Sequence, residues 1–101
     1  MAIRKSKEEN FEIKGNLSEN IEKCKLALEK GEFTKINVNE TISQITANYK
    51  KFSVWGEIKV TLTENNDKTK INAVSTANSD NIFALFSSPN DKILSQFKDN
   101  L

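Results

Sequence analysis

The sequence contains no histidine, and Cys24 is the single cysteine among its 101 residues. The missing imidazole removes the side chain that most often acts as a general base or metal ligand near neutral pH. A lone cysteine forms no disulfide within the chain, which is typical of a reducing compartment. We therefore predict a cytoplasmic protein that is not an enzyme and uses no metal and no cofactor.

Glycine, proline and long apolar runs are also scarce. Three glycines and one proline leave little material for a flexible linker, and 101 residues suffice for one domain. No apolar run approaches the roughly 18 residues of a membrane span, and "MAIRKSKEEN" lacks the apolar core of a secretory signal. We predict a single domain over residues 1–101 and no transmembrane segment.

The sequence also has no large excess of either positive or negative charge. Fifteen basic residues stand against 14 acidic ones, for a net charge of +1. This balance provides no long-range field that would attract DNA, RNA or an anionic membrane. Five lysines lie between residues 50 and 70, but Glu57 and Glu64 lie among them, which favours a solvated face over a phosphate-binding one. We predict no nucleic-acid partner.

The chain is rich in alternation of apolar and polar residues. The clearest case is residues 52–63, where Ile58, Val60 and Leu62 alternate with charged and hydroxyl side chains, the pattern of a half-buried strand. Similar alternation predicts strands at residues 10–15, 33–38, 41–50 and 69–77. Short polar turns such as "ENNDK" make neighbouring strands antiparallel.

Residues 16–31 follow a helical period instead. Their apolar positions form one stripe, comprising Leu17, Ile21, Cys24 and Leu28. Asn16 is the expected N-cap, and Gly31 is expected to end the helix in the left-handed conformation. Within this stripe Cys24 is interpreted as a small core residue.

A second helix is predicted to begin at Ser88-Pro89. Its buried stripe is expected to comprise Ile93, Leu94, Phe97 and Leu101. The element order is therefore β-α-β-β-β-β-α. This order predicts a two-layer α+β domain, a five-stranded, mainly antiparallel sheet with both helices on one face.

This order is that of the TBP-like and helix-grip architectures. The segment "SVWGEIKVTLTENNDKTKINAVS" resembles a family of short bacterial proteins with a Ser-x-Trp-Gly-Glu strand start and a return strand ending near Ser. The matching positions are Ser53, Trp55, Gly56, Glu57 and Ser75, with Asn90, Ile93 and Phe97 in the closing helix. The sequence departs at "LFSSPND", where many relatives carry a second Trp-Gly pair. The resemblance implies the fold and lends no established activity.

Trp55-Gly56-Glu57 is the most distinctive group of residues. Trp55 is interpreted either as a plug at an open end of the core, the favoured interpretation, or as the mouth of a ligand groove. Gly56 permits a bulge or a close backbone approach. Glu57 begins the solvent-facing side.

Residues 81–86, "NIFALF", are more apolar than a surface connection usually is. They are interpreted as part of the core, or alternatively as an exposed docking patch. Phe83 and Phe86 are the aromatic members of this segment.

These features lead to one functional hypothesis and one alternative. The hypothesis is a non-catalytic binding module that holds an apolar small molecule or a partner segment between the sheet and the last helix. The groove residues are expected to be Trp55, Phe83, Phe86 and Phe97, with Gly56 and Glu57 beside them. The alternative is a protein–protein interaction domain, a homodimer joined through a strand edge or residues 81–86.

Overall fold

The computed structural model describes residues 3–51, 54–79 and 89–101. Its elements are β1 (Ile3–Lys14), α1 (Leu17–Lys30), β2 (Thr34–Asn39), β3 (Gln44–Lys51), β4 (Val54–Asn65), β5 (Lys68–Ser79) and α2 (Pro89–Lys98). This is the predicted order of strands and helices. Neither helix is long and apolar enough to cross a membrane, among the residues described.

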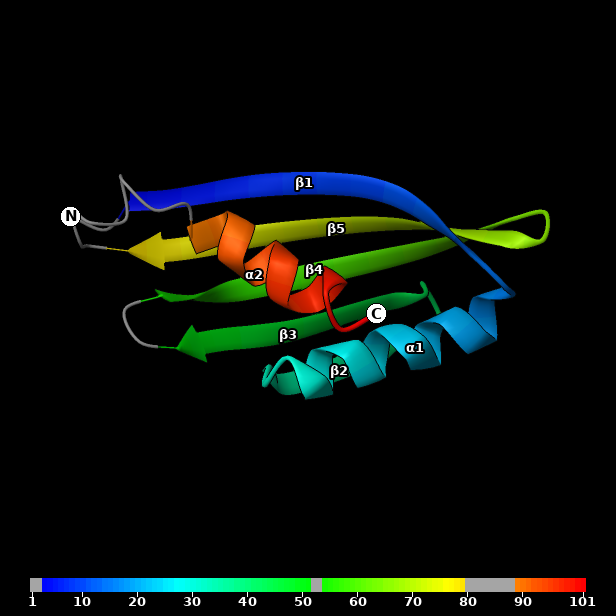
Figure 1. Ribbon diagram of the computed structural model, residues 1–101, viewed down its shortest axis with the longest axis horizontal. Helices are drawn as coiled ribbons and strands as arrows, with labels where there is room; N and C mark the ends of the chain where they lie inside the picture. The colour runs from blue at the N-terminus through cyan, green and yellow to red at the C-terminus, as the bar shows by residue number, and fades with distance from the viewer. Residues whose placement is uncertain (1–2, 52–53, 80–88) are drawn as a thin grey trace.

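The strands form one antiparallel sheet in the order β1-β5-β4-β3-β2. Figure 1 shows both helices on the same face of this sheet. We call that face the inner face and the opposite, uncovered one the open face. The predicted two-layer α+β class with a five-stranded sheet is confirmed.

The core lies between the inner face and the helices. On β4, Ile58, Val60 and Leu62 are at most 3% exposed, and on α2 Phe97 is completely buried. Burying one such side chain stabilises the fold by about 1.5–3 kcal/mol. Leu101, expected in the same stripe, is 43% exposed. That expectation was wrong because α2 ends at Lys98 and the stripe ends with it.

The first strand is longer than the alternation predicted, since β1 begins at Ile3 rather than at residue 10. Its early inner-face positions carry Lys7 and Glu9, which interrupt the apolar pattern. Both side chains are paired with α2, Glu9 with Lys98 at 2.8 Å and Lys7 with Asp91. The hydrogen bond to the Asp91 carboxylate raises the pKa of Lys7. Inward-facing charges on an outer strand also discourage pairing with another chain.

A buried hydrogen bond fixes the start of α2 to the sheet. The Ser75 hydroxyl on β5 donates to Oδ1 of Asn90 over 2.7 Å, and both residues are at most 5% exposed. Buried polar groups need such partners, because an unmatched one costs free energy comparable to a lost hydrogen bond. The position of α2 is therefore set by a polar contact as well as by apolar packing.

The ends of α1 are capped in the predicted place, but the left-handed residue at its C-terminal end is Glu32 rather than Gly31. Asn16 accepts a hydrogen bond from the Glu19 amide at 2.8 Å, as a helix N-cap does. At the other end Gly31 has φ −77°, so the prediction of a left-handed glycine was wrong. Glu32 takes that conformation at φ 65°, and Phe33 donates back to the Leu28 carbonyl over 3.0 Å. Space at Gly31 is tight, because a Cβ there would lie 3.0 Å from the Gln96 carbonyl oxygen and its neighbours would have to move by a few tenths of an ångström.

Cys24 is a core residue, as its place in the stripe indicated. It is fully buried on α1, and burial raises the pKa of its thiol to about 12. The thiol is therefore protonated at neutral pH. Only the thiolate form acts as a nucleophile or metal ligand, so this environment does not favour either role for Cys24.

Candidate functional site

A hollow opens on the uncovered face of the sheet, where β3 ends and β4 begins. Its volume is about 610 Å³, within the roughly 300–1,000 Å³ of small-molecule sites. We call it the Trp55 hollow, and its lining residues are Thr34, Lys35, Asn48, Tyr49, Lys50, Trp55, Gly56 and Glu57.

Strand register brings these residues together from three strands. Lys50 on β3 is the cross-strand partner of Trp55 on β4. One row further along, Asn48 lies opposite Glu57 on one side and opposite Thr34 of β2 on the other. Directly opposite side chains lie about 4.5–5.5 Å apart at Cβ. The hollow is thus bounded by two adjacent rows of the open face.

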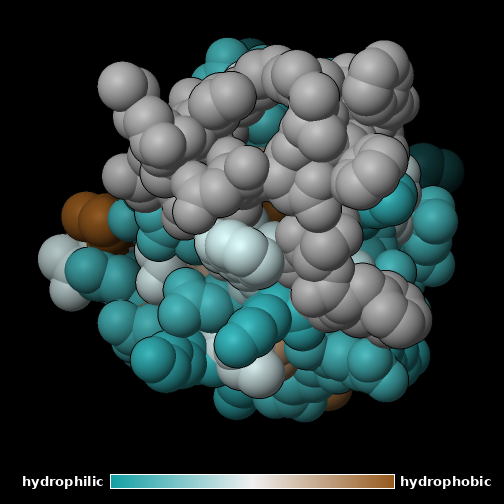
Figure 2. Space-filling view, turned by 90° about the vertical axis from the view of Figure 1, so that its left-hand side faces the viewer, coloured by the Kyte–Doolittle hydropathy of each residue, from teal (hydrophilic) through white to brown (hydrophobic). Residues whose placement is uncertain are grey.

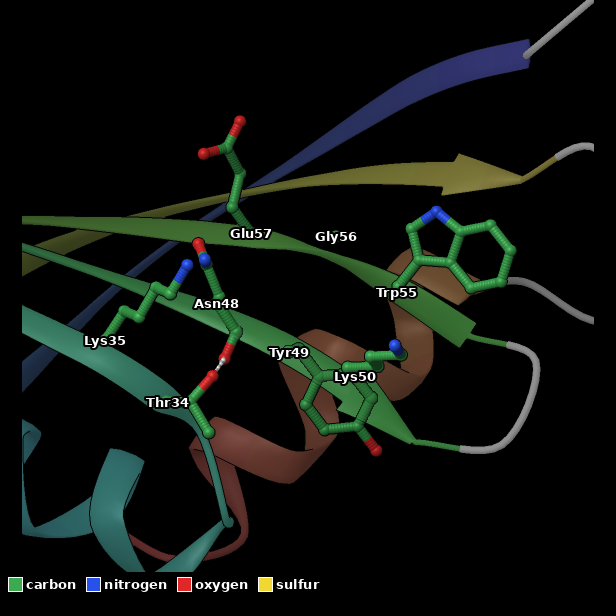
Figure 3. Close-up of a pocket in the computed structure, with 8 residues that line it drawn as sticks. All are labelled: Thr34, Lys35, Asn48, Tyr49, Lys50, Trp55, Gly56 and Glu57. Carbon is green, nitrogen blue, oxygen red and sulfur yellow. Dashed lines mark hydrogen bonds between the residues drawn. The ribbon is translucent and has the colours of Figure 1, made fainter.

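Figure 3 shows how the side chains point. Lys35, Asn48, Glu57 and Trp55 rise on the same side of the sheet, whereas the Tyr49 ring lies on the opposite side. Tyr49 is 6% exposed and packs against Phe33 with ring centroids 5.0 Å apart. Tyr49 therefore belongs to the core and borders the hollow only from within the sheet.

Gly56 permits a close approach of two strands, as predicted. A Cβ at this position would lie 2.3 Å from the Thr76 carbonyl oxygen of β5, far inside contact distance. The register runs without a shift through its partners Tyr49 and Ala77. Of the two roles proposed for this glycine, close approach is therefore confirmed and a bulge is not found.

A bulge occurs instead in β2. The register shifts between Thr34 and Asn37, and Lys35 inside that interval has φ 50°. Thr34 and Lys35 are consecutive and both exposed, whereas Ile36 packs against the core. The extra residue thus interrupts strand alternation and turns Lys35 outward.

Of the residues predicted for one groove, the structure places Trp55 and Phe97 on opposite faces of the sheet. Trp55 is 39% exposed on the open face, so its interpretation as a core plug was wrong. Phe97 is completely buried on the inner face. A single groove lined by both Trp55 and Phe97 is excluded because the sheet separates them. Phe83 and Phe86, with the rest of the 81–86 segment, lie outside the described residues.

The polar groups of the hollow differ in the ion pairs and hydrogen bonds that they make. Among the described residues, the ammonium groups of Lys35 and Lys50 make no ion pair. Thr34 donates to the Asn48 carbonyl oxygen at 3.5 Å. Glu57 also borders a second hollow of about 340 Å³ that continues along the open face beside Lys59 and Val74. The hollow therefore combines an exposed indole, an amide, two exposed cations and the carboxylate of Glu57.

Seen from the end where β3 finishes and β4 begins, the described surface is mostly hydrophilic (Figure 2). Sequence reasoning missed Thr34, Lys35, Asn48 and Lys50 as neighbours of Trp55. The alternation that places Ile58 inward, followed back along the strand, places Glu57 and Trp55 outward. The sequence therefore contained the information needed to place these two residues on the open face.

No protein-family model and no curated protein sequence matches the chain. Among solved structures, norcoclaurine synthase from Thalictrum flavum shares the fold. A truncated form has a TM-score of 0.66 and 8% identity, over 98% of this chain and 91% of that one. A point mutant with a transition-state analogue has a TM-score of 0.67 and 8% identity, over 99% and 92%.

A third structure, in complex with dopamine and hydroxybenzaldehyde, has a TM-score of 0.65 and 8% identity, over 98% of this chain and 84% of that one. At such identity the likeness shows the fold alone. The class of this protein is thereby defined as a helix-grip α+β domain, which confirms the architecture implied by the Ser-x-Trp-Gly-Glu resemblance.

The comparison corrects one prediction. The protein was expected not to be an enzyme, yet the similar structures are those of a synthase, and one holds a transition-state analogue. The prediction rested on the missing histidine, and this ground was too narrow, because lysine, glutamate and tyrosine also act as acids and bases in catalysis. The helix-grip fold is thus compatible with catalysis as well as with binding.

Proposed function

We propose that this protein is a small-molecule binding module that takes its ligand in the Trp55 hollow on the open face. The observation that carries the proposal is the exposed indole of Trp55, bordered by Asn48, Lys50 and Lys35 in a space of about 610 Å³. Ligand sites combine an apolar surface with a few polar groups that fix orientation. The hollow has both, on the neighbouring strands β2, β3 and β4.

Trp55 is the only tryptophan, so intrinsic fluorescence reports directly on this hollow. The test is a fluorescence screen of mixed aromatic acids, amines and sugars, followed by mapping of backbone amide chemical shifts in NMR spectra. A ligand is expected to shift the amides of Asn48, Lys50 and Glu57. The variant Trp55→Ala is expected to lose the binding, whereas Leu26→Ala, an exposed site on α1, should retain it. Binding that survives Trp55→Ala would refute the proposal.

A second site deserves the same screen because two observations favour it. One fold neighbour was solved with dopamine and hydroxybenzaldehyde, and small residues, Ala47, Gly56 and Ala77, share the inner face of the sheet. An apolar molecule or a partner segment held between the sheet and α2 would shift the amides of Ile93, Leu94 and Phe97 instead. The amide map therefore distinguishes this site from the Trp55 hollow.

The homodimer alternative has less support from the described residues. β1 and β2 are the outer strands of the sheet, but β1 carries inward-facing charges at Lys7 and Glu9 that disfavour strand pairing between chains. Sedimentation at increasing protein concentration tests this alternative. A size that rises with concentration would support dimerisation.

Membership in the Ser-x-Trp-Gly-Glu family and a reducing compartment remain proposals. The family pattern is supported by the hydrogen bond between Ser75 and Asn90, which joins two of its positions across the core. The compartment is supported by Cys24, whose buried thiol has no second cysteine with which to pair.

A further inference from the structure

We propose that the ligand of the Trp55 hollow is a planar aromatic molecule bearing an anionic group on a short linker. The ring stacks on Trp55, and Lys35 and Lys50 bind the anion. This inference rests on the proposed function, because it names the ligand class of the same site.

The charges of the hollow favour an anion. Lys35 and Lys50 are exposed cations without an ion pair among the described residues. Glu57 is the one carboxylate of the lining, and it is engaged in a contact of its own. Asn48 adds an amide that can donate hydrogen bonds. A neutral ligand such as a sugar would leave both cations unmatched, whereas an anionic ligand complements them.

The spacing of the sheet favours a ring with a separate anionic group. Trp55 and Lys50 occupy one row, and Asn48 occupies the next row on the same face. Successive same-face residues of a strand are about 7 Å apart. Lys35 reaches over the Asn48 row in Figure 3, on the side away from Trp55. Lys50, in the same row as Trp55, is therefore the nearer cation for an anion joined to the stacked ring by a short linker. Lys35 lies on β2, two strands from Trp55, and its long side chain approaches from across the Asn48 row.

The backbone conformation of Lys35 at the bulge in β2 supports a role in binding. Its φ of 50° is left-handed, a conformation that suits glycine or asparagine and is unfavourable for lysine. The other left-handed non-glycine residues described, Glu32, Ser43 and Asn66, lie in connections, whereas Lys35 lies inside a strand. A lysine at this position makes the fold less stable, and it is turned toward the hollow. Strain of this kind is typical of binding sites.

The test titrates 3-phenylpropionate against its uncharged analogue 3-phenylpropanol and against propionate, and adenosine monophosphate against adenosine. Trp55 fluorescence and amide shifts give the dissociation constants. We expect the aromatic anion of at least one pair to bind about tenfold more tightly than its neutral partner. The pair that binds distinguishes a carboxylate from a phosphate.

Two variants test the lysines separately from the fold. Lys35→Asn removes the charge and keeps a residue that tolerates the left-handed conformation. It is expected to weaken anion binding about tenfold while the melting temperature stays equal or rises. Lys50→Gln is expected to weaken binding similarly. Lys70→Gln, on the open face but outside the hollow, is the matched control and should bind normally.

Several outcomes overturn the inference. Equal affinity for charged and neutral ligands, or normal binding by Lys35→Asn, would refute the anionic class and leave the proposed hollow standing. Tighter binding of a single-stranded oligonucleotide than of the mononucleotide, with steep salt dependence, would replace the small molecule by a polymer. Binding by none of these probes would refute the ligand class. Ligand shifts confined to α2 would refute the proposed function as well.

Discussion

The two faces of β4 differ in how far their side chains are covered. Its inner positions Ile58, Val60 and Leu62 are at most 3% exposed beneath the helices, whereas Trp55 on the open face is 39% exposed. The backbone and its register are the same for both sets. The difference lies in what covers them, so substitutions on the inner face should change stability and those in the Trp55 hollow of the open face should change binding.

The largest effect is expected for Phe97→Ala. Phe97 is completely buried between α2 and the sheet, and truncation of such a ring removes about 3–5 kcal/mol of stability. Urea unfolding followed by circular dichroism measures the change. A loss below about 1 kcal/mol would show that the inner face is loosely packed and would weaken the contrast between the faces.

Gly56→Ala tests the close approach of β4 and β5 at Gly56. The new methyl group would lie 2.3 Å from the Thr76 carbonyl oxygen, so β4 and β5 must separate. We expect a loss of about 1–3 kcal/mol, measured by thermal unfolding. The control Ala47→Gly removes a methyl group from the same inner face and should cost less, about 0.5–1 kcal/mol. A neutral Gly56→Ala would contradict the close approach of the strands.

Ser75→Ala removes the buried donor that fixes α2. Loss of the 2.7 Å hydrogen bond to Asn90 should destabilise the fold by about 1–2 kcal/mol. Ser95→Ala, an exposed serine on α2, should stay within about 0.5 kcal/mol. Chemical denaturation of both variants makes the comparison, and equal values would mean that apolar packing alone positions the helix.

The smallest effect on stability is expected for Trp55→Ala. Its ring is already partly in water, so the free energy of unfolding should change by about 1 kcal/mol or less. Ligand binding should nevertheless be lost. A stability loss comparable to that of Phe97→Ala would remove the distinction between the faces and assign Trp55 to the core.

Local patterns in the sequence determined the elements and most of their faces. The alternation around Ile58 and the stripe through Cys24 and Leu28 are periodic, and periodicity follows from backbone geometry alone. Extended to Trp55, the same alternation leads to the open face, but the favoured interpretation assigned Trp55 to the core and was wrong. Alternation failed for the first part of β1, where Lys7 and Glu9 face inward, because their partners on α2 are remote in sequence.

The candidate site was predicted only in part. Trp55, Gly56 and Glu57 were recognised, but Lys35 was not, because the bulge that turns it outward depends on pairing between β2 and β3. The position of Lys50 beside Trp55 depends likewise on the register of β3 and β4. Register is a property of two paired strands, so the pattern of one strand does not show which residue of its neighbour lies opposite each position.

By itself the sequence determined the order strand–helix–four strands–helix and a buried stripe on each helix, because hydrophobic periodicity is local. Tertiary structure decided that β1 pairs with β5 and that Glu32 rather than Gly31 is left-handed. It also decided that Asn20 is buried, since its amide donates to Thr69 across 49 residues at 2.7 Å. These outcomes depend on contacts between remote segments, which form only when the layers pack.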